Sequence, residues 1–364
     1  MAVPNKIQTW QMVKPTDPKT GDKGVLERTE IDVPAIGAGE ALVKIAGCGV
    51  CHTDLSYFYD GVPTVAKPPL TLGHEISGTV VEGPANLVGK NVIIPAVIPC
   101  NNCAICASGR GNRCLAQKMP GNSIGMYGGF SSHIVVPAGD LCVIDDLKGI
   151  PLSHYAVVAD AGTTPYQAAV RADLKPGDTA IVIGSTGGVG IYMTQTAKAV
   201  GAKCVIAMGR NEEKLKKNQQ YGADATDDWK GKDEKAVKEE LKAICKANGI
   251  PSNYGLKIFE CTGSKPGQEL ALSLLTFTSK LVVVGFGLVK TEYMMSKLMA
   301  FDADIIGTWG CLPKYYPEVL KLVQADKIAI EPFLETRPMS TIREVFEEQH
   351  AGKLEKRIVL EPDF

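Results

Sequence analysis

Apolar residues in the first part of the chain come in short runs that glycine and proline interrupt. The runs at 41–50 (ALVKIAGCGV) and 76–82 (ISGTVVE) are rich in β-branched residues, and 91–98 (NVIIPAVI) repeats the pattern. Short apolar runs between turn residues are typical of β-strands. The sequence therefore predicts a β-rich first domain.

Beyond about residue 160, apolar runs alternate with longer segments that can form helices. The strand-like TAIVI (179–183) is followed by a glycine-rich turn and a predicted helix at 188–200, and KCVIAM (203–208) is followed by a predicted helix at 212–220. Strands that alternate with helices indicate an α/β domain with a doubly wound parallel sheet. We expect its further strands near 256–261, 280–285 and 303–307.

Length and the last apolar run indicate how these domains are arranged along the chain. A chain of 364 residues exceeds the usual limit of a single hydrophobic core, which predicts two domains. The tail from about residue 330 ends in RIVLE (357–361), which we expect to return to the first domain. The charge-rich stretch 227–242 (DDWKGKDEKAVKEELK) is interpreted as the solvated face of a helix.

Composition narrows the class of protein. The formal net charge is -1, which gives no electrostatic reason to expect nucleic acid or an anionic membrane as a partner. No apolar run approaches the roughly 20 residues that span a bilayer, and residues 1–10 lack the apolar segment of a secretory signal. Because four of the eleven cysteines crowd into one short segment, we expect metal binding in a reducing cytoplasm rather than disulfides.

The crowded cysteines are Cys100, Cys103, Cys106 and Cys114, with the spacing C-x2-C-x2-C-x7-C. Four thiolates can surround one zinc ion tetrahedrally, and the short spacers bring the first three together at little loop entropy. Since all four positions are cysteine, none remains for water, and the pattern predicts a closed, structural zinc site. An iron–sulfur cluster and unrelated buried cysteines are the alternatives. The x7 gap and the surrounding asparagines and glycines favour zinc.

A second set of metal-ligating residue types precedes this lobe in the chain. The segment 49–54 reads GVCHTD and 73–75 reads GHE, so Cys51, His74 and Glu75 offer a thiolate, an imidazole and a carboxylate. Three such ligands can hold one zinc ion that keeps a fourth position for a substrate oxygen. Alone, one cysteine and one histidine are more often ordinary core residues. Their occurrence beside a complete four-cysteine pattern favours an open, catalytic zinc site.

The glycine-rich turn VIGSTGGVG (182–190) follows a predicted strand and opens a predicted helix. Its glycines allow a tight turn and a close approach of the backbone to a pyrophosphate, which predicts dinucleotide binding; a turn whose glycines only serve packing is the alternative. The next strand should end in an acid that binds the adenosine ribose of NAD, but Gly209 fills that position and Arg210 follows. By chemistry alone this pair favours the 2′-phosphate of NADP, and Lys214 could contact either ribose.

Together these motifs resemble the zinc alcohol dehydrogenases of the medium-chain dehydrogenase/reductase superfamily. The resemblance rests on GVCHTD, GHE and the four-cysteine lobe. It implies an α/β fold that combines a GroES-like β-rich catalytic domain with a Rossmann domain, the doubly wound parallel sheet. We expect the GroES-like domain at 1–164 with its zinc lobe at 95–118, the Rossmann domain at 165–310, and a return segment at 311–364.

The resemblance also implies roles for the residues of the open site. The zinc ligands would be Cys51, His74 and Asp160, and Asp160 stands where many members have cysteine. Glu75 would exchange with substrate or water as a further ligand. Asp54 would orient His74 from behind by bonding its second ring nitrogen.

Proton transfer is expected to begin at Thr53, which matches the hydroxyl that bonds the substrate alcohol in the family; a simple turn threonine is the other interpretation. The next member of the proton relay in many relatives is a histidine, whereas this chain has Ser56. His52 would either contact the cofactor pyrophosphate or receive the proton, and the sequence leaves both roles open.

For the cofactor, the resemblance favours NAD, and NADP stays the alternative. Two zinc ions per chain and NAD are therefore expected, with a hydride passing from the substrate carbinol to NAD+. Arg357 matches the family arginine that reaches the pyrophosphate; a charge at a strand edge is its other interpretation. The remaining expected cofactor contacts are Gly187, Gly188, Val189, Gly190, Gly209, Arg210 and Lys214.

The segment 56–63 (SYFYDGVP) is expected to be a loop whose three aromatic residues line the substrate pocket, although loop aromatics more often serve packing. Longer stretches around the motifs resemble one branch of the family, which oxidises a ring secondary alcohol carried as a CoA thioester. These stretches are IQTWQMV (7–13), CGVCHTDLSYFYDGVPTV (48–65), KPPLTLGHEISG (67–78) and IPCNNCAICASGRGNRCLAQKMPGNSIG (98–125).

The expected partners follow from these inferences. The chain should act on a small-molecule alcohol, most closely a CoA thioester, and should form a homo-oligomer, a dimer or a tetramer, as family members do. Another aryl or alkyl alcohol, or reduction in the opposite direction, are alternatives within the class. A non-enzymatic dinucleotide-binding protein on the same fold is the alternative of another class. Its mark would be a lost zinc ligand, and this sequence keeps all of them.

Overall fold

The computed structural model describes residues 3–364 and divides them into two compact units. Unit 1 contains the described chain up to Asp160 together with Gly310–Gln324 and Ile330–Phe364, and unit 2 contains Ala161–Trp309 with Ala325–Ala329. The C-terminal segments Gly310–Gln324 and Ile330–Phe364 thus lie in the same unit as the N-terminal part of the described chain. The assignment of Ala325–Ala329 to unit 2 has no counterpart in the sequence prediction.

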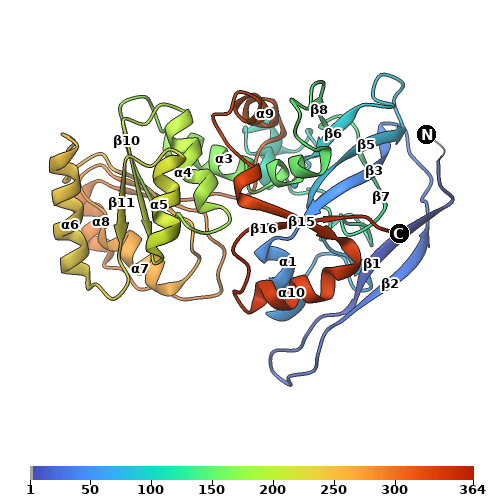
Figure 1. The fold of residues 1–364 in the computed structure, drawn as a ribbon, viewed down its shortest axis with the longest axis horizontal. Helices are drawn as coiled ribbons and strands as arrows, with labels where there is room; N and C mark the ends of the chain where they lie inside the picture. Colours follow the sequence, from blue (N-terminus) through green and yellow to red (C-terminus); the bar gives the residue numbers. More distant parts are fainter. Residues whose placement is uncertain (1–2) are drawn as a thin grey trace. The chain divides into compact units, whose positions relative to one another are not determined.

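Unit 1 is built around a seven-stranded, mostly antiparallel sheet with the order β15-β16-β3-β5-β6-β8, in which β7 also pairs with β3 (Figure 1). Its strands are β3 (Glu40–Gly49), β5 (Glu75–Glu82), β6 (Asn91–Ile94), β7 (His133–Pro137), β8 (Cys142–Ile144), β15 (Leu334–Pro338) and β16 (Arg357–Glu361). A second sheet has the order β2-β1-β4 and consists of β1 (Lys6–Lys14), β2 (Val25–Asp32) and β4 (Leu70–Thr71).

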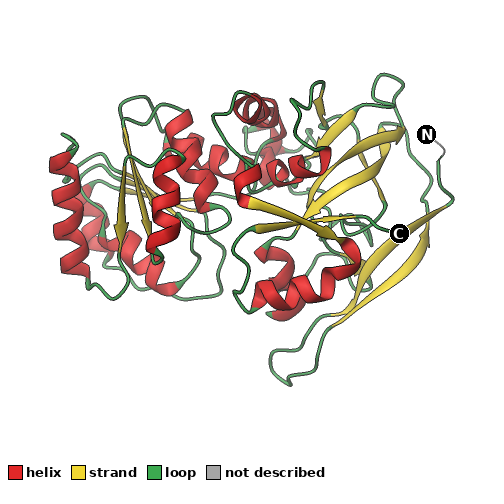
Figure 2. Ribbon diagram, in the orientation of Figure 1, coloured by secondary structure: helices red, strands yellow, loops and turns green. Residues whose placement is uncertain are grey.

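The helices of unit 1 are few and short (Figure 2). They are α1 (His52–Tyr59), α2 (Ala104–Ala107), α9 (Tyr316–Gln324) and α10 (Ile342–His350). Single 3₁₀ turns or segments occur at Gly111–Arg113, Leu152–Ala159, Pro313–Tyr315, Glu331–Phe333 and Met339–Thr341. The predicted loop at 56–63 is wrong in its first half, because α1 continues to Tyr59. Its start is fixed by the Asp54 side chain, which accepts the backbone N–H of Cys51.

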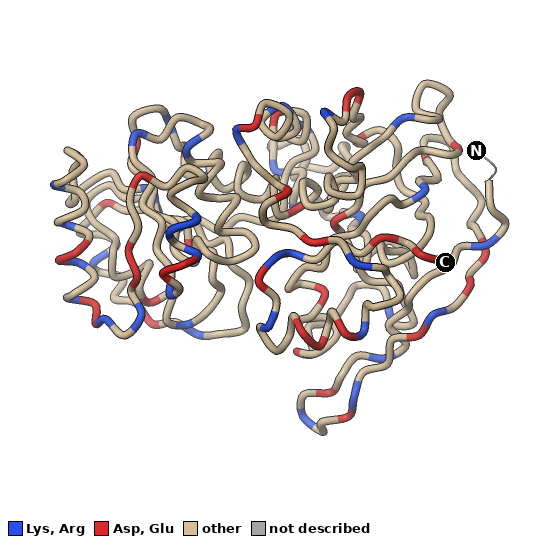
Figure 3. Tube along the Cα trace, in the orientation of Figure 1, with Lys and Arg blue, Asp and Glu red and all other residues tan. Residues whose placement is uncertain are grey.

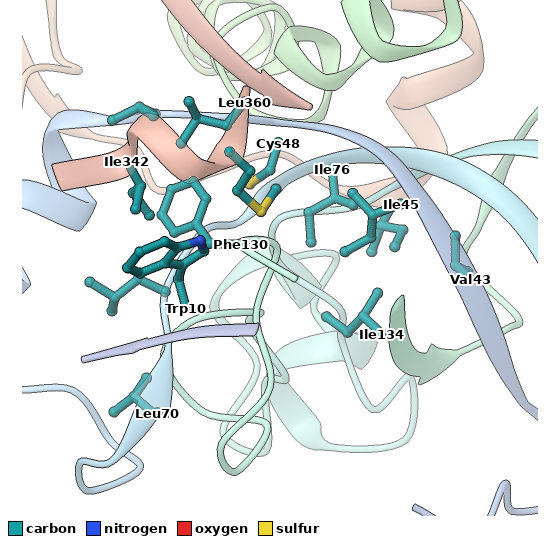
Figure 4. Close-up of a cluster of buried hydrophobic side chains, with 14 of the residues drawn as sticks. Trp10, Val43, Ile45, Cys48, Leu70, Ile76, Phe130, Ile134, Ile342 and Leu360 are labelled. Carbon is teal, nitrogen blue, oxygen red and sulfur yellow. The ribbon is translucent and has the colours of Figure 1, made fainter. Parts of the chain in front are cut away.

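The core of unit 1 joins the N-terminal sheet to the C-terminal return. Trp10 of β1, Cys48 of β3 and Phe130 pack against Ile342 of α10 and Leu360 of β16 (Figure 4). Burial of apolar surface stabilises such a cluster by about 25 cal/mol per Å². The return segment therefore completes the hydrophobic core of unit 1, and its strand β16 is fixed beside β3.

Unit 2 contains a six-stranded, wholly parallel sheet with the order β11-β10-β9-β12-β13-β14. Numbered from its first strand, this order is 3-2-1-4-5-6, the doubly wound arrangement of dinucleotide-binding domains. The prediction of a doubly wound parallel sheet is confirmed. The strands are β9 (Thr179–Ile183), β10 (Cys204–Gly209), β11 (Ala225–Asp228), β12 (Lys257–Glu260), β13 (Lys280–Val283) and β14 (Asp304–Gly307).

Helices cover both faces of this sheet, as its apolar strands require. Within β9, Ile181 and Ile183 face one cluster of helix residues, whereas Ala180 and Val182 face another. The helices of unit 2 are α3 (Thr163–Ala172), α4 (Gly190–Ala199), α5 (Glu212–Gln220), α6 (Glu234–Ala247), α7 (Lys265–Ser273) and α8 (Met295–Phe301).

The charge-rich stretch 227–242 ends in helix α6. Val237, Leu241 and Cys245 form its buried stripe, and acidic and basic residues alternate along the rest of the helix (Figure 3). This agrees with the interpretation of the stretch as a solvated helix face. Across residues 3–364, none of the helices combines the length and the apolar character that crossing a membrane requires.

Candidate metal centres and the glycine-rich turn

The four cysteines of the predicted lobe converge on one point. Their sulfur atoms lie 3.3 Å apart for Cys100 and Cys114, 3.5 Å for Cys103 and Cys106, 3.7 Å for Cys103 and Cys114, and 4.0 Å for Cys100 and Cys106. A tetrahedral zinc ion with Zn–S bonds of about 2.3 Å separates its sulfurs by about 3.8 Å. The donor set therefore fits one tetrahedral zinc ion.

Backbone N–H groups donate hydrogen bonds to the sulfur atoms of Cys103 and Cys114. Hydrogen bonds from the backbone N–H groups of Leu115 and Cys106 lower the pKa of Cys103 to about 6. The backbone N–H groups of Cys100 and Ala116 each lie 3.3 Å from the Cys114 sulfur and donate to it. Amide donors stabilise thiolates, which are the form of cysteine that binds metals. The pKa values of Cys100 and Cys103 are thus lowered, whereas desolvation raises the pKa of Cys106 to about 11.

The second set of predicted ligands also converges. The ligand atoms of Cys51, His74, Glu75 and Asp160 all lie within 4.8 Å of one another. Asp160 Oδ2 is 3.9 Å from Cys51 Sγ and 3.6 Å from His74 Nε2. These donors come from the N-terminus of α1, the start of β5 and the end of the Leu152–Ala159 segment. One sulfur, one nitrogen and one oxygen donor, with Glu75 behind them, suit zinc.

A buried carboxylate sets the orientation of His74. Asp54 Oδ1 lies 3.3 Å from His74 Nδ1 and accepts the Gly73 N–H at 3.0 Å, and its Oδ2 accepts the Cys51 N–H at 3.0 Å. Asp54 therefore ties together the segments that carry two of the donors, and it leaves His74 Nε2 facing Asp160. Burial lowers the pKa of His74, but the Asp54 charge and the bonds to Asp160 raise it well above its usual value.

Glu75 is the fully buried carboxylate of this ligand group. Its Oε1 accepts a hydrogen bond of 2.7 Å from Arg357, while among the described residues its Oε2 has no hydrogen-bond partner. Complete burial raises the pKa of Glu75 to about 7, even though the Arg357 charge acts in the opposite direction. A buried carboxylate oxygen without a partner is costly unless a cation or donor meets it. A Cβ at Gly49 would lie 2.2 Å from Oε2, so a larger residue there would require the Glu75 carboxylate to move.

The hydroxyl and imidazole beside the centre differ in exposure. Thr53 is half-buried, and its Oγ1 lies 3.7 Å from Cys51 Sγ. His52 is exposed at the first position of α1, whereas Ser56, at the position expected for a relay histidine, is buried one turn further along the helix. Two of the three aromatics that follow serve packing: Phe58 contacts Phe346, and Tyr59 stacks on His350.

The glycine-rich turn of unit 2 connects β9 to α4. Gly184 has a φ of +80°, and a Cβ at Gly190 would lie 2.1 Å from its carbonyl oxygen. Gly187 and Gly188 are exposed directly before the first turn of the helix, whose backbone N–H groups have no partners within the helix. The turn also includes Val189, which precedes the helix. An exposed, side-chain-free backbone at a helix N-terminus fits a phosphate group.

Gly209, Arg210 and Lys214, the residues expected at the adenosine ribose, lie at the end of β10 and in the segment that follows it. A Cβ at Gly209 would lie 2.8 Å from Thr186 of the turn, so the two segments are close. The guanidinium of Arg210 lies over the ring of Trp229, 5.4 Å from its centroid. Lys214 is half-buried in the first turn of α5, and its backbone N–H is capped by Asn211.

Two residues in this region were not singled out from the sequence. Asp228 lies opposite Gly209 in the β10–β11 register, which brings a carboxylate to the strand end that lacks one of its own. Trp229 follows it directly and supports Arg210. A tryptophan within a charge-rich stretch was the available signal, but its meaning depends on the pairing of β10 with β11.

Comparisons with known proteins agree with this architecture. A model of the alcohol dehydrogenase GroES-like domain matches residues 37–146, and a model of zinc-binding dehydrogenases matches residues 188–325. An alcohol dehydrogenase from Geobacillus stearothermophilus is 31% identical over 344 residues, which cover 93% of this chain and 96% of the relative. An NAD-dependent alcohol dehydrogenase from Sulfolobus acidocaldarius is 31% identical over 313 residues, covering 83% and 87%.

Among solved structures, acetophenone reductase from Geotrichum candidum in complex with NAD is 26% identical, with a TM-score of 0.82. The similarity covers 99% of this chain and 98% of that chain. Together with the family models, this likeness confirms the predicted fold class, a GroES-like β-rich domain with a Rossmann-type parallel sheet.

Proposed function

The chain belongs to the zinc-binding alcohol dehydrogenase family, an oxidoreductase family, and we propose that it oxidises a secondary alcohol at the centre formed by Cys51, His74 and Asp160. The observation that carries the proposal is the approach of the three side chains, from distant parts of unit 1, to within 4.8 Å of one another. When bound, zinc would act as a Lewis acid that lowers the pKa of the alcohol hydroxyl, and the nicotinamide would accept the hydride.

The residues of the chain divide the remaining tasks. Asp54 orients His74, so that one ring nitrogen is free for the metal. Thr53 borders the ligand set, and its hydroxyl would accept the substrate proton at Oγ1 while it donates its own proton onward. His52, exposed one position earlier on α1, is proposed to pass the proton to water, and contact with the cofactor pyrophosphate is the alternative role. Glu75 supplies a further oxygen to the metal, and Arg357 holds it in place.

The four-cysteine lobe is proposed to hold a second zinc ion with a structural role. Its support is the complete set of cysteine donors at distances that suit a tetrahedral ion. A site without an open position offers no place for a substrate oxygen. Two zinc ions per chain are therefore expected, of which one serves the reaction.

NAD is proposed as the cofactor in preference to NADP. Its pyrophosphate would bind the exposed backbone of the turn at Gly187, Gly188, Val189 and Gly190. Support comes from Asp228, whose carboxylate at the end of β11 could bond the ribose hydroxyls that a β10 acid usually bonds. Arg210 is the observation that favours NADP, so initial rates with both cofactors decide between them. A clear preference for NADP would overturn this part of the proposal.

The proposed substrate is 6-hydroxycyclohex-1-ene-1-carbonyl-CoA, oxidised to the 6-oxo compound in anaerobic benzoyl-CoA degradation. Its support is the resemblance of 7–13, 48–65, 67–78 and 98–125 to the family branch with this activity. The alternative is another aryl or alkyl alcohol. We would compare kcat/KM for the CoA thioester alcohol with those for benzyl alcohol and ethanol, with zinc counted in the same preparation.

The outcomes of this experiment separate the hypotheses. Two zinc ions per chain and the highest kcat/KM for the thioester alcohol would support the full proposal. Two zinc ions with faster turnover of a simple alcohol would keep the enzyme class and replace the substrate. One zinc ion per chain and no turnover of any alcohol would favour a dinucleotide-binding protein without catalytic activity.

A homo-oligomer is proposed to form through unit 2. On α8, Met295 and Met299 are 67% and 77% exposed, and within the described chain the neighbouring edge strand β14 pairs only with β13. Exposed apolar side chains beside an unpaired strand edge favour association with a second copy. Sedimentation of the Met299→Lys variant beside the parental protein tests this, because the variant should have a lower molar mass if α8 forms the interface. If both proteins keep the same molar mass, and it exceeds that of one chain, the interface lies elsewhere.

A cytoplasmic location is proposed as well. Within residues 3–364 none of the eleven cysteines forms a disulfide: one belongs to the open centre, four belong to the lobe and six lie outside both. Free thiols in such number suit a reducing compartment. Fractionation of the source cells with an activity assay would test the location.

A further inference from the structure

Tyr316 is a fully buried tyrosine at the start of α9 whose hydroxyl joins two distant segments of unit 1. The hydroxyl accepts the backbone N–H of Ala96 at 3.0 Å and donates to the carbonyl oxygen of Ala159. Along the chain these two partners lie 220 and 157 residues from Tyr316. One side-chain oxygen thus satisfies one buried donor and one buried acceptor.

Each of these partners lies close in the sequence to a proposed metal ligand. Ala159 precedes Asp160, the oxygen donor of the open centre, and Ala96 belongs to the segment 95–99 that runs into Cys100 of the lobe. Asp160 lies between the Leu152–Ala159 segment and α3, with a φ of -139° and a ψ of -61°. Since it belongs to neither element, regular helical bonding does not set the direction of its carboxylate.

The position of Tyr316 is itself well fixed. In α9, Tyr316, Val319, Leu320 and Val323 form one buried stripe at helical spacing. The segment before the helix is also anchored, because a Cβ at Gly310 would lie 2.3 Å from the side chain of Val97. The Tyr316 hydroxyl is therefore held by the well-packed helix α9. Its two hydrogen bonds restrain the backbone at Ala96 and Ala159.

We propose that Tyr316 is a positioning residue that holds Asp160 in place to bind the metal and links the open centre to the chain segment entering the cysteine lobe. The inference rests on the proposed function, in which Asp160 is a zinc ligand. It goes beyond that function because Tyr316 is not one of the metal-donor residues and acts through the backbone at Ala159 and Ala96. Residues behind metal ligands typically change metal affinity by 10- to 100-fold when they are altered.

The test is the Tyr316→Phe variant, which removes one oxygen atom and keeps the ring. The matched control is Tyr155→Phe, since Tyr155 is also fully buried and donates to a backbone carbonyl, that of Leu147, which adjoins no proposed ligand. Zinc release to a chromogenic chelator would be followed for both variants and for the parental protein. Cobalt(II) would replace zinc in a second series, because its absorption bands report the geometry of the ligands.

We expect Tyr316→Phe to weaken metal binding at the open centre by about tenfold and to alter the cobalt bands of that centre. The slow release from the four-cysteine lobe and the release from Tyr155→Phe should match the parental protein. Parental metal affinity and cobalt bands in Tyr316→Phe would overturn the inference. So would an equal loss in Tyr155→Phe, because that result would reflect general loosening of unit 1.

A second measurement decides the question even if Tyr316→Phe does not fold. Amide hydrogen exchange at Ala96 would be compared between the zinc-loaded parental protein and the Asp160→Ala variant. The proposed link predicts faster exchange at Ala96 in the variant, and unchanged exchange would refute it. If the parental protein itself holds no metal at the open centre, the proposed function fails; if it does and Tyr316→Phe behaves like it, only this inference fails.

Discussion

The guanidinium of Arg357 lies 2.7 Å from a carboxylate oxygen of Glu75, and the two side chains are 7% and 0% exposed. The same Nη1 atom lies 3.3 Å from the carbonyl oxygen of Val50 and donates to it. The pair therefore connects β16, the last strand of the chain, to the N-terminal ends of α1 and β5, which carry the ligands. The register of β16 with β3, in which Val359 lies opposite Gly49, creates this contact.

Replacement of Arg357 by methionine should destabilise the fold. The variant leaves the Glu75 carboxylate buried without its partner, and the loss of one member of a buried ion pair costs about 3 kcal/mol or more. Denaturant unfolding of the parental protein and the variant measures the difference. Arg337→Met is the control, since Arg337 pairs with Glu335 and Glu348 at a more exposed position. Equal stability of Arg357→Met and the parental protein would contradict the prediction.

Replacement of one lobe cysteine should remove one zinc ion per chain and lower the stability of the fold. In Cys103→Ser the four-thiol site is broken, and a structural metal contributes its binding free energy to folding. We expect one zinc ion per chain instead of two and a lower Tm, with the metal at Cys51 retained. Cys142→Ser, a buried cysteine outside both centres, should keep both ions. Metal analysis beside thermal unfolding checks both variants, and two retained ions in Cys103→Ser would refute the lobe assignment.

The Asp54→Asn variant should weaken the open centre, because its amide NH2 also faces one of the backbone N–H groups of Cys51 and Gly73 that the carboxylate accepts. Asparagine keeps the shape of the side chain, but it removes the charge that faces His74 Nδ1. Loss of such a partner behind a ligating histidine typically lowers metal affinity by about 10- to 100-fold. Metal titration followed by competition with a chelator gives the affinity. Asp145→Asn, which alters an exposed carboxylate, should leave it unchanged.

Much of this arrangement could be predicted because the relevant signals are local. The spacing of Cys100 to Cys114 and the strand–turn–helix context of 179–200 depend on neighbouring residues alone. Asp160 could be added to Cys51 and His74 only through the family resemblance, since its approach to them depends on the packing of distant segments. The sequence misplaced a loop at 56–59 because Cys51 is an unusual residue at a helix N-terminus.

Contacts that depend on strand register or on helix packing could not be predicted. Trp229 supports Arg210 only because β11 pairs with β10 in the observed register. Tyr316 reaches Ala96 and Ala159 only after the return segment has folded onto unit 1. In both cases a single residue type carries no signal of its own, because many buried tyrosines and tryptophans serve packing alone.

The Gly190→Ala variant should fold less stably and lose dinucleotide binding. Its Cβ would lie 2.1 Å from the carbonyl oxygen of Gly184, so the turn or the helix must shift. Overpacking of this kind costs about 1–3 kcal/mol. In Gly139→Ala the new Cβ meets nothing within 4 Å, which makes it the control. Fluorescence titration with NADH and thermal unfolding test the pair, and normal NADH affinity in Gly190→Ala would argue against the turn as the pyrophosphate site.

The Arg210→Ala variant separates the two cofactors. The guanidinium, held over Trp229, is the cationic group at the end of β10 that can meet a 2′-phosphate. Hydrogen bonds to charged groups contribute about 1.5–3 kcal/mol, and 1.4 kcal/mol is a factor of ten, so residual activity with NADP should fall by about tenfold or more. Activity with NAD should stay near the parental value, because NAD offers a neutral hydroxyl there. Trp229→Leu should act in the same direction but less strongly, since it frees the guanidinium without removing it. Steady-state kcat/KM with each cofactor provides the measurement, and an equal fall for NAD and NADP in Arg210→Ala would mean that Arg210 supports the fold of this region rather than cofactor choice.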